Sequence, residues 1–182
     1  RITTYARLAH ELSNSNSIEC AGRKITEAAE ELIGWDSAEL VILDAKTHTC
    51  RPVVNIDLVD GVKQEVPSAR DGLEPSPRMR KTIVEGAELI LRRHPTDRVE
   101  GMALFNTTTR RSASLMFVPI RDGHTTVGTL AIHSYETDAY QQADLDTLQS
   151  LADYCGGALS RIFSREALDE SESRLREAQA IS

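Results

Sequence analysis

The sequence predicts an α/β domain in which helices cover both faces of a central antiparallel sheet of about six strands. Two apolar runs of strand length, residues 115–120 and 127–132, flank Asp122-Gly123, a dipeptide that strongly favours a β-hairpin. Because these runs are continuous rather than alternating, they indicate strands that are covered on both faces. After Tyr140 the apolar period changes from two residues to about 3.6, which predicts a long C-terminal helix.

The N-terminal part contains two predicted helices. A weakly helical segment covers residues 4–12, and the Ser- and Asn-rich run 13–17 ends it. Ser17 is a good N-cap for a second helix over residues 18–33. Its apolar stripe consists of Ile18, Ala21, Ile25, Ala28, Ala29, Leu32 and Ile33. Gly34 follows and is placed to end the helix in the left-handed conformation.

Six segments are predicted as strands. They are residues 38–44, 50–56, 62–66, 89–91, 115–120 and 127–132. Between the third and fourth strands, a loop at 67–77 precedes a short helix at 78–85 that Gly86 ends. Residues 92–111 are the least regular segment, and their length indicates a functional or mobile loop. Pro119 lacks an N–H donor, so that side of it is expected to face an edge or an irregularity of the sheet.

The C-terminal helix is predicted to run from residue 141 to the end of the chain. Only Gly156-Gly157 interrupts the pattern, and 40 helical residues would span about 60 Å. Its first half carries an apolar stripe that packs on the sheet. Residues 164–182 are polar, with Leu168 and Leu175 at heptad spacing, which favours a coiled-coil linker. A frayed, monomeric helical tail is the alternative.

Composition excludes several classes of protein. No window approaches ~20 apolar residues, so no membrane span is expected in this segment. The net charge is −7, and an acidic chain is a poor binder of nucleic acid. Three widely spaced cysteines argue against a disulfide framework and favour a reducing compartment, for which we predict the cytoplasm.

The charge is unevenly distributed along the chain. Residues 70–124 carry 10 Lys and Arg against 7 Asp and Glu, and the remainder is strongly acidic. This basic middle would suit an anionic ligand. A solvated, arginine-rich loop region is the alternative explanation.

The order of these elements resembles that of a GAF domain, also described as a profilin-like fold. The residues that carry the resemblance in the second half are Val118-Pro119-Ile120, Asp122-Gly123, Val127-Gly128-Thr129-Leu130, Tyr140 and Asp144-Leu145. The helix–Gly–strand–turn–strand order of the first half matches as well. The resemblance covers about residues 18–162 and implies the strand order 3-2-1-6-5-4. It divides the chain into an N-terminal linker helix (1–17), a GAF sensor domain (18–163) and a signalling helix or coiled-coil linker (164–182).

GAF domains are a large class of small-molecule-sensing and dimerisation modules. The resemblance therefore implies a regulatory, non-catalytic sensor module of a two-component signalling protein, of the bacterial sensor histidine kinase type, with a fused PAS or kinase output domain. A small molecule would bind in a cavity between the sheet and a cover formed by residues 67–111. The terminal helices would form a homodimer. A ligand-free structural dimerisation module is the alternative, and no residue pattern assigns a cofactor.

Twelve residues are candidates for the wall of this cavity. The lining candidates are Met79, Ile83, Leu89, Leu91, Met102, Phe105, Phe117 and His133. Arg78, Arg92, Arg93 and Arg110 are candidates for an anionic group. His133 ends a strand and is expected either to face the ligand or to be a hydrogen-bonded wall residue.

Specialised branches of the family fit poorly. The cyclic-nucleotide motif reads here as His133-Ser134, Tyr140 and Asp144-Leu145, so only its aromatic residue and its Asp survive. No cysteine is followed by His, as covalent bilin attachment commonly requires, and no cysteine lies between Cys50 and Cys155, where methionine sulfoxide reduction needs a thiolate. His48-x-Cys50 lacks a second ligand pair for zinc, and no nucleophile–base pair can be assigned. We therefore predict neither a metal site nor a catalytic site.

Overall fold

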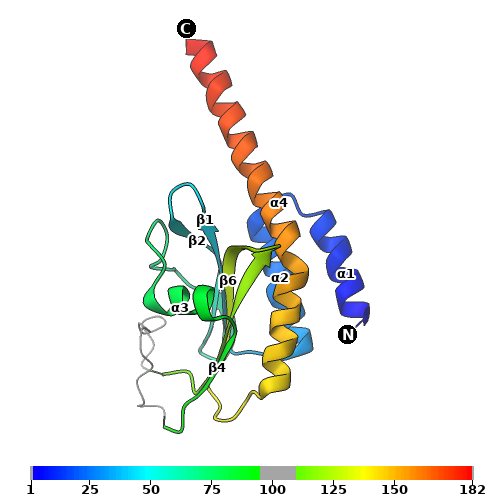
Figure 1. Ribbon diagram of the computed structural model, residues 1–182, viewed down its shortest axis with the longest axis vertical. Helices are drawn as coiled ribbons and strands as arrows, with labels where there is room; N and C mark the ends of the chain where they lie inside the picture. The colour runs from blue at the N-terminus through cyan, green and yellow to red at the C-terminus, as the bar shows by residue number, and fades with distance from the viewer. Residues whose placement is uncertain (1, 95–109, 182) are drawn as a thin grey trace.

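The structure is a computed structural model that describes residues 2–94 and 110–181. Six strands form one antiparallel sheet in the order β3-β2-β1-β6-β5-β4, which confirms the predicted order (Figure 1). The strands are β1 (Ser37–Asp44), β2 (Thr49–Val59), β3 (Val62–Glu65), β4 (Glu88–Leu91), β5 (Ser114–Asp122) and β6 (Thr125–Ser134). The helices are α1 (Ile2–Ser13), α2 (Ile18–Leu32), α3 (Pro77–Glu85) and α4 (Gln142–Ile181).

The sheet separates two layers (Figure 1). One face packs against α2 and α4, and the main hydrophobic core lies between them. We call this the helix face. The other face lies toward α3, where Met79 packs with Val41 and Cys50 in a small second cluster. We call it the cover face, and the fold predicted from the sequence is confirmed in both layers.

Both predicted helix boundaries next to the sheet are confirmed. The Ser17 side chain accepts a hydrogen bond from the Cys20 N–H at 3.1 Å and caps α2. Gly34 has a φ of 89° and donates its N–H to the carbonyl of Ala29, so it ends α2 in the left-handed region that favours glycine. Ser76 likewise caps α3 by accepting from the Met79 N–H at 3.2 Å.

Pro119 lies at an edge, as its missing donor requires. Among the described residues, β4 pairs with β5 from Ser114 to Phe117, two residues short of Pro119. The Pro119 carbonyl accepts from Gln149 Nε2 of α4 at 3.1 Å, so this side of the residue points away from β6. A register shift follows directly, between Ile120 and Arg121.

Helix α4 runs without a break over 40 residues. Leu148, Cys155 and Ile162 share one row and are buried against the sheet. Beyond them the helix leaves the domain, and Leu168 and Leu175 are 59% and 61% exposed (Figure 1). Among the described residues no helix has the length and apolar character needed to cross a membrane.

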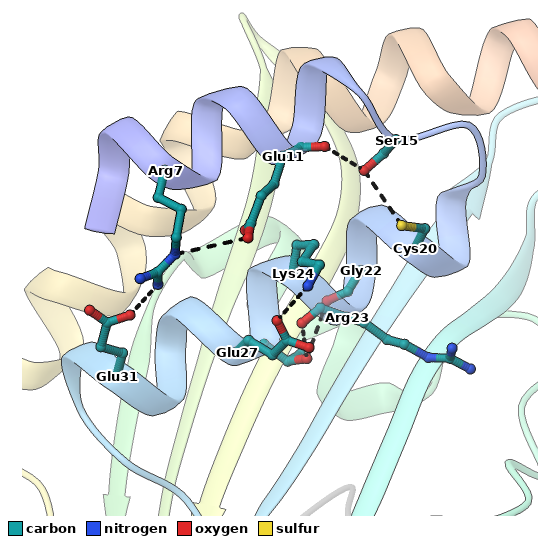
Figure 2. A network of polar contacts seen from close by, with 10 residues as sticks. Arg7, Glu11, Ser15, Cys20, Gly22, Arg23, Lys24, Glu27 and Glu31 are labelled. Atoms are coloured by element: carbon teal, nitrogen blue, oxygen red, sulfur yellow. Dashed lines mark hydrogen bonds and ion pairs between the residues drawn. The ribbon is translucent and has the colours of Figure 1, made fainter. Parts of the chain in front are cut away.

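Helix α1 is docked on α2 rather than detached from the domain. Leu8 and Leu12 are buried, and Thr4 donates to a carboxylate oxygen of Glu31 at 2.9 Å. Figure 2 shows Arg7 between Glu11 of its own helix and Glu31 of α2, with which it forms ion pairs. The segment predicted as a linker helix therefore contributes side chains to the core.

Candidate ligand-binding site on the cover face

Alternation along β1 decides which side chains reach the cover face. Ala38, Leu40 and Ile42 belong to the core of the helix face. Successive residues of a strand point to opposite faces. Ser37 and Glu39 therefore lie on the cover face, on the same side as Val41.

The neighbouring strands continue this surface. Glu39 is paired with Asn55 of β2 on one side and with Ala131 of β6 on the other. Ser37 is paired with His133 of β6. The floor of the cover face is therefore polar at its centre, with a small residue, Ala131, beside the carboxyl group.

Phe117 and His133 form the next part of the floor. Their ring centroids lie 5.4 Å apart, and both side chains lie on the cover face. The Arg78 guanidinium of α3 lies 5.5 Å from the Phe117 ring centroid. Arg78 is only 7% exposed and forms an ion pair with Glu88 of β4, which Lys81 also contacts at 2.8 Å. Since Glu88 offsets its charge, Arg78 holds α3 against β4 through this ion pair and is less available to bind an anionic ligand.

A second polar group lies at the end of β2. The sequence prediction ended this strand at residue 56, but pairing with β3 extends it to Val59 and brings Asp57 into the sheet. Asp57 is fully buried and accepts from the Tyr135 hydroxyl at 2.6 Å. The guanidinium of Arg110 lies 4.5 Å from the Tyr135 ring centroid. Arg110 thus lies close to this edge of the cover face.

The loop before α3 is tied to β2 by hydrogen bonds. Asn55 donates from Nδ2 to the carbonyls of Val66 and Pro67, both at 3.1 Å. Cys50 exchanges backbone hydrogen bonds with Leu73 and Gly72, at 2.7 and 3.0 Å. This loop therefore forms a wall beside the floor and carries Arg70 near Glu39, whose pKa the Arg70 charge lowers.

Burial perturbs two ionisable groups of the floor in opposite directions. Burial raises the pKa of Glu39 from 4.5 to about 7, against the opposing influence of Arg70. Burial lowers the pKa of His133 from 6.5 to about 4; Arg92 lowers it further and Asp57 raises it. Shifts of this kind are frequent at functional sites.

The structure brings several of the predicted residues together. Phe117 lies against both His133 and Arg78 on the cover face, and Met79 lies on the same face, where it packs with Val41 and Cys50. Arg92 is buried and close enough to His133 for its charge to act on the imidazole.

The other predicted residues are less central. Ile83 is half-buried on α3, Arg93 is exposed, and Arg110 lies over Tyr135. Met102 and Phe105 lie outside the described residues.

Two predicted residues lie on the wrong side of the sheet. Leu89 is paired with Met116 and packs against the core of the helix face. Leu91 is paired with Ser114, which shares that face by alternation, and Leu91 is 42% exposed. The prediction placed both leucines in the cavity wall because a strand of four residues is too short for its pattern to reveal which face is covered.

Sequence reasoning missed the polar centre of the floor. The missed residues are Ser37, Glu39, Asn55, Asp57, Glu88 and Tyr135. One signal was available: Glu39 interrupts an otherwise apolar strand, and a carboxylate is costly to bury without a reason. In residues 2–94 and 110–181, no group of three or more His, Cys, Asp or Glu side chains could hold a metal ion.

Comparisons with known proteins identify the family. The family model described as GAF domain matches residues 15–160. No curated protein matches the sequence.

Solved structures share the fold at low identity. The GAF domain of an Acinetobacter phosphoenolpyruvate-protein phosphotransferase is 12% identical, with a TM-score of 0.63, over 90% of this chain and 94% of that one. The GAF domain of a putative sensor histidine kinase from Pseudomonas syringae pv. tomato is 15% identical, with a TM-score of 0.57, over 93% and 92%. A free methionine-R-sulfoxide reductase from Neisseria meningitidis, solved with its substrate, is 14% identical, with a TM-score of 0.59, over 90% and 89%.

At these identities the solved structures establish the fold alone, whereas the family model covers most of the sequence. GAF domains serve as regulatory sensor modules of signalling proteins. This chain belongs to the GAF domain family.

Proposed function

We propose that the chain is a sensor module that binds a small molecule on the cover face and transmits the change through α4. The observation that supports this most directly is the polar centre of the cover face. Ser37, Asp57 and His133 are buried there, together with the half-buried Glu39. A domain that needed only a stable core would place apolar side chains at these positions, because burying polar groups costs free energy.

We propose that the effect of ligand binding passes through the sheet, from the cover face to the helix face. Phe117 contacts His133 and lies beneath Arg78 on the cover face, while its neighbour Met116 is buried in the core that α4 shares. A ligand that shifts Phe117 would therefore displace side chains on the opposite face. Such a ligand must bind the two arrangements of the domain with different affinities.

The exposed half of α4 is the proposed output. It continues beyond the last buried row, at Ile162, to Ile181. We propose that residues 164–182 form a signalling helix that leads to a fused output domain, such as a PAS or kinase domain of a two-component protein. The isolated domain, 18–163, would then be non-catalytic, and residues 1–17 would form an N-terminal linker helix that packs on it.

Native mass spectrometry of the purified chain tests the binding step. A stoichiometric bound small molecule supports the proposal. Hydrogen exchange before and after its removal should then differ both in α3 and in α4 beyond Ile162. An empty protein whose melting temperature does not change with any of a panel of metabolites contradicts it.

A ligand-free dimerisation module is the second candidate. It is favoured by the exposed apolar residues Leu168, Leu175 and Ile181 on α4. Two copies pairing along this helix would cover Leu168 and Leu175, which have heptad spacing, in the seam of a coiled coil. Dimerisation and sensing are compatible, and the mass-spectrometric result decides whether dimerisation stands alone.

A further inference from the structure

At the centre of the cover face, three polar side chains carry oxygen atoms that form no hydrogen bond within the described part of the chain. The Ser37 side chain is 1% exposed, and its hydroxyl has no hydrogen-bond partner among the described residues. The buried Oδ1 of Asn55 also has none there. For Glu39, the described part of the chain supplies neither a hydrogen bond nor an ion pair, although the Arg70 charge acts on it.

The strand register places the three side chains close enough for one functional group of a ligand to contact them all. Glu39 and Asn55 are paired across β1 and β2. Opposed residues of antiparallel strands have Cβ atoms roughly 4.5–5.5 Å apart. Ser37 is two residues from Glu39 on the same face, at roughly 6.7 Å along the strand. One small polar group above β1 can therefore contact all three side chains.

The orientation of the Asn55 amide is determined by its partners. Both groups beside its Nδ2 are backbone carbonyls, of Val66 and Pro67, and a carbonyl can only accept. The NH2 group must therefore point toward the loop, and Oδ1 must point away from it. Asn55 thus offers a ligand an acceptor and no donor.

The set as a whole is rich in acceptors. Asn55 supplies an amide oxygen, Glu39 supplies carboxyl oxygens, and Ser37 supplies a hydroxyl that can accept or donate. Among these three side chains an anionic group would meet one hydroxyl donor, and an ionised Glu39 would repel it, with the Arg70 charge offsetting part of that repulsion. A nitrogen group with several N–H bonds would satisfy all three, and its contact with the carboxylate would be charge-assisted.

We propose that the cover face binds its ligand through a nitrogen donor group (an ammonium, an amidinium or a primary amide) held by Glu39, Asn55 and Ser37. This rests on the proposed function, because it names the chemical class for the same site. It also reverses the expectation from the basic middle of the sequence. Two of the arginines near the floor are engaged, Arg78 with Glu88 and Arg110 with the Tyr135 ring. Arg70 lies near Glu39, and its charge offsets part of the negative charge of this set.

Amide NMR titrations of the full chain test the assignment. The probes are butylamine, benzamidine and benzamide, each beside a nitrogen-free counterpart of similar shape: butanol, benzoate and acetophenone. The expected result is binding by the nitrogen probes, with the largest shifts at Ser37, Glu39 and Asn55. Glu39→Gln should weaken the cationic probes about tenfold or more, and Ser37→Ala by a smaller factor. Glu65→Gln, at an exposed carboxylate on β3, is the matched control and should change nothing.

Each other outcome overturns the assignment. Binding of only the nitrogen-free probes would show the wrong ligand class and leave the sensor function standing. Nitrogen-probe binding that is unchanged in both folded variants would place the group elsewhere. Binding by none of the six would remove the assignment, and native mass spectrometry would then decide separately whether the domain holds another molecule.

Discussion

Glu166 of α4 accepts a hydrogen bond from the backbone N–H of Ile18 at 2.9 Å, across 148 positions of sequence. Ile18 is the first residue of α2, and its N–H is one of the donors that a helix leaves unsatisfied at its start. Arg51 of β2 lies between Glu166 and Glu19, at 3.4 and 2.7 Å. The start of α2, the sheet and the exit of α4 therefore meet at one polar junction, three residues beyond the predicted domain boundary at 163.

Replacing Glu166 should destabilise the domain. Glu166→Ala removes an acceptor from the start of α2 and a partner from Arg51, and we expect a loss of about 1–2 kcal/mol in the free energy of unfolding. Glu170→Ala is the control, since it makes the same change one turn later, where the Arg174 ion pair is exposed and contributes within about 0.5 kcal/mol. Urea unfolding measures both. Equal losses would mean that the Ile18 contact adds nothing to stability.

Gly156 is required by a close approach of α4 to the β5–β6 hairpin. A Cβ at this position would lie 1.7 Å from the Arg121 carbonyl oxygen, whereas a Cβ at Gly157 would meet only Asp122 Oδ1 at 3.7 Å. Gly156→Ala should therefore lower the free energy of unfolding by about 2–4 kcal/mol, because the helix must move away from the hairpin.

Gly157→Ala is the matched control and should raise that free energy by about 0.5–1 kcal/mol, since alanine favours the helix. Thermal melts of the two variants measure the difference. Parallel behaviour of both would contradict the close approach.

Glu39 should make the stability of the domain depend on pH. Its folded pKa, about 7, exceeds its ordinary value of 4.5, so the folded state holds a proton that the unfolded state releases. The Glu39 contribution therefore destabilises the fold progressively as pH rises from 4.5 to 7, and the cost is constant above that range. Its upper limit is about 3 kcal/mol.

Glu39→Gln isolates this contribution. The variant should match the unsubstituted protein near pH 4.5 and exceed its stability by an increasing margin up to pH 8. His133 has the opposite effect, because its lowered pKa reduces the stability of the fold as pH falls below 6.5. Both proteins contain His133, so its contribution cancels when their free energies of unfolding are subtracted. Denaturant unfolding at a series of pH values measures the margin. A margin that does not vary with pH would exclude the raised pKa.

Burial separates the apolar residues of α4 into two roles. Leu148→Asp and Ile162→Asp place an unpaired charge in the core and should each cost about 4 kcal/mol or more. Leu168→Asp changes an exposed side chain and should leave the melting temperature of the domain nearly unchanged while weakening self-association. Calorimetry and sedimentation on the three variants test this division. The same drop in melting temperature in all three would refute it.

Local patterns were sufficient for most elements of the fold. Ser17 and Gly34 mark the ends of α2, Asp122-Gly123 marks the hairpin, and the structure agrees at each position. Such signals are readable because capping and turn chemistry depend on a few adjacent residues. The strand order followed from the family resemblance rather than from any local pattern.

The candidate site was only partly predictable. Met79, Phe117, His133 and Arg78 were anticipated and lie on the cover face, where the structure brings the last three together. Leu89 and Leu91 were assigned to the wrong face, because strand register depends on pairing with β5. Asp57 was missed because its place in the sheet depends on β3 and on Tyr135.

The sequence by itself determined the elements, their order along the chain and the length of the exit helix, since these follow from periodicity and from capping or turn residues. Only the tertiary structure decided which side chains share the cover face, that Ser37, Glu39 and Asn55 are neighbours on it, and that Glu166 accepts a hydrogen bond at the start of α2. The physical reason is that register and packing join residues far apart in sequence, whereas a sequence pattern reports only on neighbours within a few turns or strand positions.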